Sequence, residues 1–400
     1  MKALACRFAL IISGLCLASA VEAQSRFRQC ASRNSKDHSN HISQSSTDDE
    51  NRKWRVSWST DDCSVDMVAR GDVKFSPDLS AVESIGRDGY FEITERIGRE
   101  KRKYEAERGA DGALQVQYSV NGERSMFDAE ARKWLSTLIV ELERNSGFAA
   151  KTRVGAILRK DGVDGVLNEV GNMTSDHVQR LYLTVLMDSA TLSAGDARKV
   201  LQTAGKVLES DYELASLLIA MGKGNHVTPS TSAEYAQAAL TIQSDYERRR
   251  AFSALLKVPG LTSPVLRTVL EAASTMKSDY ELASLLLELG PAGLTSADMR
   301  TAFFTAASHI KSDYEQRRAY GALVKSAELS KELLSALLKS APDIASDYEL
   351  ASLLVDIAKR HRLDSDLREA YIRAADSIQS DHEHRRALSA LVKQTGRSSL

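Results

Sequence analysis

The sequence has little net charge, few cysteines and no long apolar run. Its 400 residues include 53 basic and 54 acidic side chains, which give a formal net charge of -1. This balance gives no electrostatic case for nucleic acid as a partner, which needs a strongly basic face, and none for an anionic membrane. The apolar run at 8–18 is shorter than the roughly 20 residues that a membrane-spanning helix needs.

Sequence signatures of catalysis and of metal binding are also missing. The four cysteines lack the local Cys/His spacing of a zinc site. Gly222-Lys223-Gly224 lacks the upstream glycine and the following Ser or Thr of a phosphate loop. The segment 382–386 begins like a zinc-peptidase helix, but Arg386 stands where the second histidine must lie. We therefore predict that the protein is not an enzyme and has no cofactor or metal; an active site that the fold assembles from distant residues is a rival reading.

The first 23 residues have the pattern of a signal peptide. Lys2 and Arg7 give a charged start, the apolar run at 8–18 follows, and small residues mark candidate cleavage sites at 18–20 and 21–23. We predict an exported bacterial protein, periplasmic or secreted, with no integral membrane segment after cleavage. An uncleaved membrane anchor is the alternative.

Two cysteines, Cys30 and Cys63, remain in the predicted mature chain. An exported compartment oxidises thiols, so these two are a candidate disulfide. Such a bond would tie the N-terminal tail to the first domain.

Composition and hydrophobic period divide the chain that follows. Residues 24–51 are polar and are predicted to form a flexible linker. Between 52 and 126 apolar residues alternate with polar ones, as at 114–120, and the Asn-Gly pair at 121–122 is a hairpin signal, so we predict a small antiparallel β domain. Helical spacing begins after it and predicts a connecting helix over 127–147.

Residues 148–400 are organised by a short motif, Ser-Asp-Tyr-Glu, whose close copies return at a constant step. The copies begin at Ser210, Ser244, Ser278, Ser312, Ser346 and Ser380. A fixed period in the range of roughly 20–50 residues indicates a stacked repeat architecture. We predict a mainly α fold in which the small β domain precedes an α-solenoid of helical hairpins, with about seven repeats and a degenerate N-terminal cap.

Each copy has the S-x-x-E form of a capping box. In such a box the serine hydroxyl accepts from the N–H three residues on, and the glutamate reaches back to the serine N–H. The predicted capping pairs are Ser210 and Glu213, Ser244 and Glu247, Ser278 and Glu281, Ser312 and Glu315, Ser346 and Glu349, and Ser380 and Glu383. A second set of caps is expected near the middle of each repeat, at Thr228, Thr262, Ser296, Ser330 and Asp364.

Every second copy carries a pair of arginines. The pairs are Arg249 and Arg250, Arg317 and Arg318, and Arg385 and Arg386. One hypothesis is a ladder of basic contacts for an acidic segment of a partner, which makes these six residues the candidate binding residues. The other is local pairing, because Asp245, Asp313 and Asp381 lie four residues before the first arginine of each pair. The two hypotheses do not exclude each other.

The copies that continue as Arg-Arg-Ala-x-x-Ala-Leu resemble HEAT-like repeats of poorly characterised exported bacterial proteins. Similar repeats follow the membrane-embedded metallopeptidase domains related to β-lactam sensors. The β segment, with Gly71-Asp72-Val73-Lys74-Phe75 and Gly89-Tyr90-Phe91, looks similar to the N-terminal portion of some of the exported proteins. The resemblance implies no catalytic residue, because the peptidase portion is not in this chain. The period also equals the tetratricopeptide length, but that family's Trp, Leu-Gly and Tyr signature is missing.

These observations predict a non-enzymatic exported scaffold or adaptor, which presents an extended surface to an unidentified envelope protein or peptide. The alternative is a sensory or regulatory envelope protein, in which the β domain binds a ligand and the solenoid relays the signal to a membrane partner.

Overall fold

The computed structural model describes residues 43–47, 53–59, 63–326 and 329–397. The chain divides into two compact units, Met1–Val185 and Leu186–Leu400, and each is described by itself. An antiparallel sheet precedes an array of helices, so the predicted fold class is confirmed. Every helix in the described part of the chain is too short or too polar to cross a membrane.

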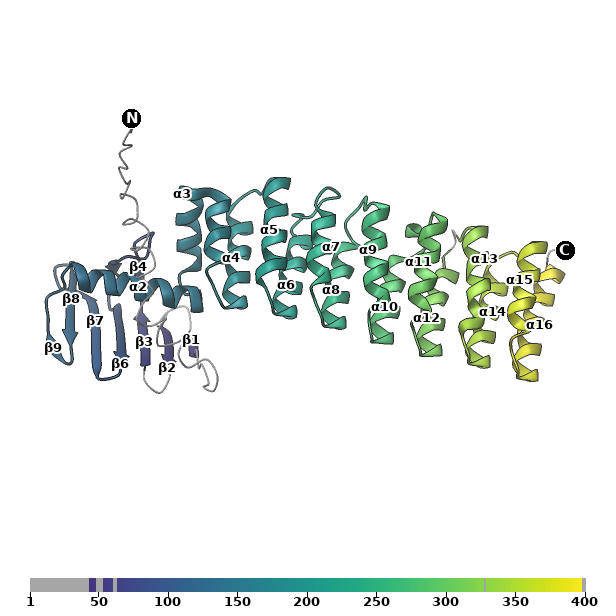
Figure 1. Cartoon of the computed structure of the whole chain (residues 1–400), viewed down its shortest axis with the longest axis horizontal. Coiled ribbons are helices and arrows are strands. Elements are labelled where there is room, and N and C mark those ends of the chain that lie inside the picture. Colours follow the sequence, from purple (N-terminus) through teal and green to yellow (C-terminus); the bar gives the residue numbers. More distant parts are fainter. Residues whose placement is uncertain (1–42, 48–52, 60–62, 327–328, 398–400) are drawn as a thin grey trace, which may run out of the picture. The chain divides into compact units, whose positions relative to one another are not determined.

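The N-terminal unit contains a seven-stranded antiparallel sheet (Figure 1). Across the sheet the strands are β1 (Ser43–Thr47), β2 (Lys53–Ser59), β3 (Cys63–Arg70), β6 (Tyr90–Ile97), β7 (Glu100–Arg108), β8 (Leu114–Val120) and β9 (Glu123–Arg124). β4 (Val73–Phe75) and β5 (Val82–Ile85) form a separate two-stranded sheet. Asn121 and Gly122 join β8 to β9 with φ values of 54° and 92°, the left-handed conformation that this hairpin signal predicts.

Strand β1 lies inside the segment predicted to be a flexible linker. Its backbone pairs with β2 in antiparallel register, from Ser43 opposite Ser57 to Thr47 opposite Lys53. The linker prediction is therefore wrong for residues 43–47; the rest of 24–51 lies outside the described residues. The sequence Ser-Gln-Ser-Ser-Thr gave no strand signal, because backbone pairing at a sheet edge does not require alternating apolar side chains.

Helix α2 (Ala129–Ser146) closes the core of the sheet. Leu135, Leu138, Ile139 and Leu142 are at most 2% exposed and belong to one cluster with the buried strand residues. Burying such a side chain stabilises a fold by roughly 1.5–3 kcal/mol. The helix expected only to connect two domains is thus a structural part of the β unit.

Cys63, the first residue of β3, is 3% exposed and is disulfide-bonded. Its predicted partner, Cys30, lies outside the described residues. The pairing of these two cysteines stays a prediction.

Two further helices, α3 (Ala150–Val170) and α4 (Asp176–Ser189), are tied to α2 through polar side chains. The Glu169 carboxylate accepts from Arg144 at 3.0 Å and from Arg153 at 2.9 Å, and Tyr182 donates to Glu143 at 2.8 Å. The second compact unit begins at Leu186, within α4, whereas the sequence predicted that the solenoid begins at residue 148.

The C-terminal unit is a stack of helical hairpins in two layers (Figure 1). The first layer consists of α5 (Ala194–Val207), α7 (Ser232–Leu240), α9 (Ser263–Ser274), α11 (Ala297–Ala307), α13 (Lys331–Ser340) and α15 (Ser365–Ala375). The second layer consists of α6 (Asp211–Lys223), α8 (Asp245–Leu255), α10 (Asp279–Leu289), α12 (Asp313–Val324), α14 (Asp347–Arg360) and α16 (Asp381–Arg397). The 3-10 helices η1 (Pro291–Gly293) and η2 (Ala341–Asp343) precede α11 and α14. Each helix packs beside the next one in its own layer.

The apolar residues at offsets 7, 8 and 11 from each motif serine form the core of the stack. Leu285, Leu286 and Leu289 of α10 are at most 8% exposed, and Tyr320 of α12 is completely buried. One hairpin cannot bury both of its faces alone, so this burial depends on the neighbouring repeats.

The second set of predicted caps forms the expected side-chain bond at three of its five positions. Ser296, Ser330 and Asp364 accept a backbone N–H through their side chains. Thr262 takes the cap position of α9 without a side-chain bond. The prediction for Thr228 is wrong, because residues 228–231 form a turn and α7 begins after Thr231.

Candidate functional site

The Ser-Asp-Tyr-Glu segments begin the second-layer helices, as predicted. In each of the six copies the serine hydroxyl accepts a hydrogen bond from the glutamate N–H, at 3.3–3.4 Å. This half of the capping box is confirmed. It fixes where each helix begins, and so places the aspartate and tyrosine in its first turn.

A contact between repeats takes the place of the other half of the capping box. The serine N–H donates to the aspartate of the preceding repeat, so the prediction that the glutamate accepts this N–H is wrong in these copies. The pairs are Ser244 with Asp211 (2.7 Å), Ser278 with Asp245 (2.9 Å), Ser312 with Asp279 (2.8 Å) and Ser380 with Asp347 (2.8 Å). We call these bonds the aspartate staples. They hold consecutive second-layer helices in register.

With the serine N–H bound by the staple, the glutamate carboxylates bind arginines. Arg249 of α8 pairs with Glu281 of α10 and lies 3.6 Å from Glu288 of the same helix. In the next copy that carries an arginine pair, Arg317 lies 3.6 Å from Glu349. Arg317 also lies 3.0 Å from Asp356, the counterpart of Glu288. The first arginine of these two pairs therefore joins its repeat to the next one.

The second arginine of each pair binds within its own helix and, in two copies, to the preceding repeat. Arg250, Arg318 and Arg386 pair with the glutamate three residues earlier. Arg318 also donates to Ser284 at 2.5 Å, and Arg386 donates to Ser352. The guanidinium of Arg318 stacks 4.7 Å from the Tyr280 ring centroid.

The predicted local pairing of each first arginine with the aspartate four residues earlier is wrong. The carboxylate of Asp245 accepts from the Lys277 and Ser278 N–H groups, and that of Asp313 accepts from the Ala345 N–H. Arg385 donates to the backbone carbonyl of Asp381 at 3.1 Å. Five of the six arginines are paired with other carboxylates, whereas Arg385 has no ion pair among the described residues. Most of this ladder therefore presents little uncompensated charge to a partner.

Tyrosines, by contrast, project from the second layer in five of the six motif copies, and His382 takes this place in the sixth. Tyr212, Tyr246, Tyr280, Tyr314 and Tyr348 are between 52% and 59% exposed. Aromatic side chains of this size are usually buried, whereas tyrosine is enriched in protein–protein interfaces. The tyrosine is the third residue of the Ser-Asp-Tyr-Glu motif, but the motif predicted only where a helix begins and not that the tyrosine is exposed.

Lysines form a second ladder at offset 13 from the motif serine. They are Lys223, Lys257, Lys325, Lys359 and Lys393. All five are exposed, and among the described residues none of them is in an ion pair. Pro291 takes the corresponding place after α10. Among the described residues of the layer, these lysines carry positive charge that no ion pair compensates, as do the exposed Arg360 and Arg385.

The tyrosines and lysines lie on one side of their helices. In α14, Lys359 lies eleven positions after Tyr348, which is close to three helical turns and about 16 Å along the axis. We call the surface formed by these five tyrosines and five lysines the tyrosine–lysine face.

A groove on this face separates α6 from α8, with a volume of about 420 Å³. Lys223 and Lys257 line it together with Ile219, Ser253 and Ala254. Ser253 is 8% exposed, and its hydroxyl has no hydrogen-bond partner among the described residues. The groove therefore combines a partly apolar floor with basic edges.

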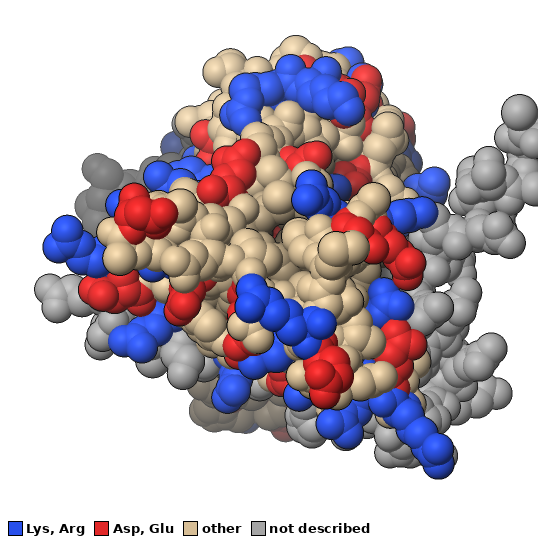
Figure 2. Space-filling view, turned by 90° about the vertical axis from the view of Figure 1, so that its left-hand side faces the viewer, with Lys and Arg blue, Asp and Glu red and all other residues tan. Residues whose placement is uncertain are grey.

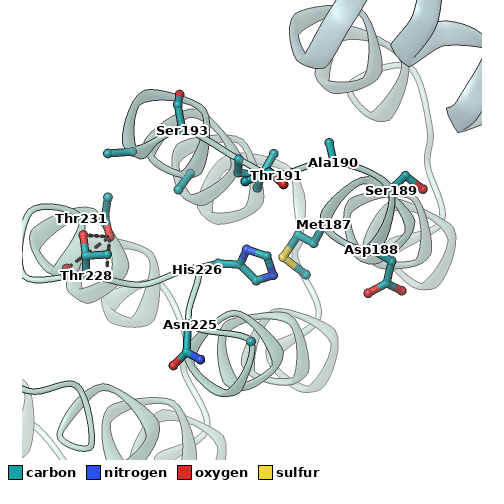
Figure 3. A pocket seen from close by; sticks show the side chains of 14 residues that line it. Met187, Asp188, Ser189, Ala190, Thr191, Ser193, Asn225, His226, Thr228 and Thr231 are labelled. Carbon is teal, nitrogen blue, oxygen red and sulfur yellow. Dashed lines mark hydrogen bonds between the residues drawn. The ribbon is translucent and has the colours of Figure 1, made fainter.

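A second hollow, of about 470 Å³, is lined by residues 187–197 and 224–231 (Figure 3). The imidazole of His226 points toward Met187, and the carboxylate of Asp188 is turned away from it. A nucleophile and a base would have to lie within hydrogen-bond reach of each other. The labelled side chains of this hollow do not provide such a pair.

The most perturbed carboxylate of the N-terminal unit is buried. Burial raises the pKa of Glu143 to about 7, against the opposing effect of its hydrogen bonds from the Ala149 N–H and the Tyr182 hydroxyl. Glu143 is 0% exposed and lies between three helices. A substrate could not reach it, so its perturbed pKa has a structural cause.

Acidic and basic side chains are interspersed on the molecular face drawn in Figure 2. This distribution agrees with the net charge of -1.

No family model matches the chain, and no curated protein matches it either. A solved structure titled "Computational Design of Self-Assembling Cyclic Protein Homooligomers" is similar to this chain at 16% identity, over 65% of this chain and 88% of that one. Its TM-score of 0.15 is too low to carry an argument about fold or function.

Proposed function

We propose that this chain is a non-enzymatic exported adaptor, which binds an envelope protein or peptide along the second layer of its solenoid. The observation that carries the proposal is the ladder of five tyrosines, each more than half exposed at the same place in its repeat. Single exposed apolar groups are normal on a protein surface, but a periodic row of large aromatic rings marks an interaction site.

The architecture supports the same conclusion. Stacked repeats form a long surface on which each repeat offers the same contact, and such folds act through extended binding surfaces. The aspartate staples and the inter-repeat arginine pairs hold the rows in register. A partner would therefore meet a preorganised row of side chains, which lowers the entropy cost of binding.

Export belongs to the proposal as well. The charged start, apolar run and small residues of the first 23 positions support it. An envelope location would make another envelope protein the natural partner.

Affinity capture from an envelope extract tests the proposal. The purified protein is compared with a variant carrying Tyr246→Ser, Tyr280→Ser and Tyr314→Ser, and with a control carrying Met126→Ser and Ile372→Ser, which changes apolar side chains that are 81% and 42% exposed elsewhere. Saturable capture of one protein by the wild type and the control, with loss in the tyrosine variant, is the expected result. Equal capture by all three forms, at unchanged helix content, would overturn the proposal.

A further inference from the structure

We infer that the tyrosine–lysine face binds an acidic polypeptide segment in the polyproline II conformation, with a carboxylate at every third residue. The inference rests on the proposed adaptor function and names the chemistry of the partner. Three observations support it: the lysines of the second layer that have no ion pair, the spacing of the repeats and the exposed tyrosine rings.

The charge of the face selects an acidic partner. Its carboxylates are already engaged, the aspartates by backbone N–H groups and Glu281 and Glu349 by arginines. The five lysines of the face are exposed and have no ion pair among the described residues. A carboxylate beside each of them would supply the missing counter-charge.

The spacing of the repeats selects the conformation. Packed helices lie about 8–10 Å apart, so one lysine and one tyrosine are presented at about that interval. A polyproline II chain has three residues per turn and a rise of about 3.1 Å per residue, so residues on one side recur about every 9.3 Å. In an extended strand, same-side residues recur about every 6.6 Å, which does not match one contact per helix.

The width of the face admits such a chain between its two rows. In α6 and α14, the tyrosine and lysine backbones are about 16 Å apart along the helix, and the lysine side chain leans toward the helix N-terminus and thus toward the tyrosine. Lys257 and Lys325 lie just after the ends of α8 and α12. A segment in the middle would direct carboxylates to the lysines and proline rings to the tyrosines. Exposed aromatic rings are the usual binding surface for polyproline II segments.

Where this path crosses from α6 to α8, the groove between the two helices supplies a floor. Ile219 and Ala254 supply its apolar surface, and Lys223 and Lys257 lie at its edges. Arg249 and Arg250 also line the groove, but each is paired with glutamate, so the lysines make the new charge contacts.

Two peptides of identical composition test the inference against the full chain. In the first, Glu-Pro-Pro is repeated six times; in the second, the six glutamates are placed together at one end. Fluorescence anisotropy at low salt should show at least about tenfold tighter binding of the periodic peptide, since several ion pairs of modest strength add up only when they form together. Binding should weaken as the salt concentration rises.

Matched charge variants locate the site. The face variant carries Lys257→Gln, Lys325→Gln and Lys359→Gln; the control carries Lys206→Gln, Lys311→Gln and Lys339→Gln, three exposed lysines outside the face. The control also removes lysines from the last turns of α5 and α13, so it matches the loss of a charge at a helix C-terminus. The face variant should bind the periodic peptide about tenfold more weakly, and the control should bind like the wild type.

Three results would overturn the inference. They are equal binding of both peptides, equal effects of both lysine triples, and equally tight binding of a single-stranded oligonucleotide or a sulfated polysaccharide. The capture experiment separates this inference from the adaptor proposal. If capture depends on the tyrosines but the periodic peptide does not bind, the inference is wrong and the adaptor proposal stands.

Discussion

At the scale of single residues, Glu143 makes the stability of the N-terminal unit depend on pH. Its side chain joins α2 to the start of α3 through the Ala149 N–H at 2.6 Å, and to α4 through the Tyr182 hydroxyl at 2.8 Å. Arg153 opposes the effect of burial on the pKa of Glu143, and Glu169 adds to it, yet the folded pKa is raised from 4.5 to about 7. The folded state therefore holds this proton more tightly than the unfolded state does.

The sign of the pH effect follows from this difference in proton binding. The contribution of Glu143 to stability is fully present below pH 4.5 and is lost as the pH rises to about 7. A shift of this size corresponds to roughly 3 kcal/mol. Glu143→Gln should remove this part of the pH dependence, because the amide can still accept from Ala149 and donate to the Tyr182 oxygen.

Urea unfolding followed by tryptophan fluorescence at pH 5 and pH 8 measures this effect. All three tryptophans, Trp54, Trp58 and Trp134, lie in the N-terminal unit, so the signal reports on it alone. Glu130→Gln is the control, because it removes the same charge from an 81% exposed carboxylate. If the variant and the wild type lose stability equally between these two pH values, the assignment to Glu143 fails.

At the scale of the elements, the aspartate staples should contribute most where two helices of the second layer meet. Asp245 of α8 accepts from the Lys277 N–H at 2.7 Å and the Ser278 N–H at 2.9 Å, both just before α10. Hydrogen bonds to a charged group contribute about 1.5–3 kcal/mol each in mutational series. Asp245→Ala should therefore lower the free energy of unfolding of the solenoid by roughly 2 kcal/mol or more.

Asp298→Ala in α11 is the matched control. Asp298 also lies in the first turn of a helix, but its carboxylate is 83% exposed and its nearest cation, Arg267, is 3.6 Å away. The loss of its interaction with the helix dipole costs about 0.3–1 kcal/mol. Circular dichroism at 222 nm during urea unfolding measures both variants. Equal effects would mean that the staples add nothing beyond the dipole.

The sequence predicted the elements better than it predicted the contacts between them. The constant repeat period and the capping serines located the second-layer helices, because both signals are local. The partners of Asp245 and Arg249 lie in the next repeat, far away along the chain, and local spacing suggested the wrong pairing. Strand β1 and the core position of α2 were missed for the same reason, since each depends on tertiary packing.

In the candidate site, too, the sequence predicted positions along the chain but not which side chains are paired or exposed. The arginines were the conspicuous residues of the sequence, but five of the six pair with carboxylates, as Arg249 does with Glu281 and Arg318 with Glu315. The tyrosines and lysines were equally periodic, yet only their exposure distinguishes them from core and capping residues. The exposure of one helix face depends on how the hairpins stack, so it could not be predicted from the sequence.

At the scale of the whole molecule, the central claim is that a partner binds along the second layer of the solenoid. A row of equivalent repeats, held in register by the staples, presents a tyrosine in every motif except at His382 and a lysine at the later position except at Pro291. Binding along such a row would order many repeats at once, and backbone amides near both ends of the second-layer helices would be protected.

Hydrogen exchange of the full chain, with and without its captured partner, tests this claim most directly. We predict that protection increases at the motif segments that begin α8, α10, α12 and α14 and around Lys257, Lys325 and Lys359. The first-layer helices and residues 63–145 should change little. Protection confined to residues 63–145 would contradict the claim, because the partner would then bind the β unit.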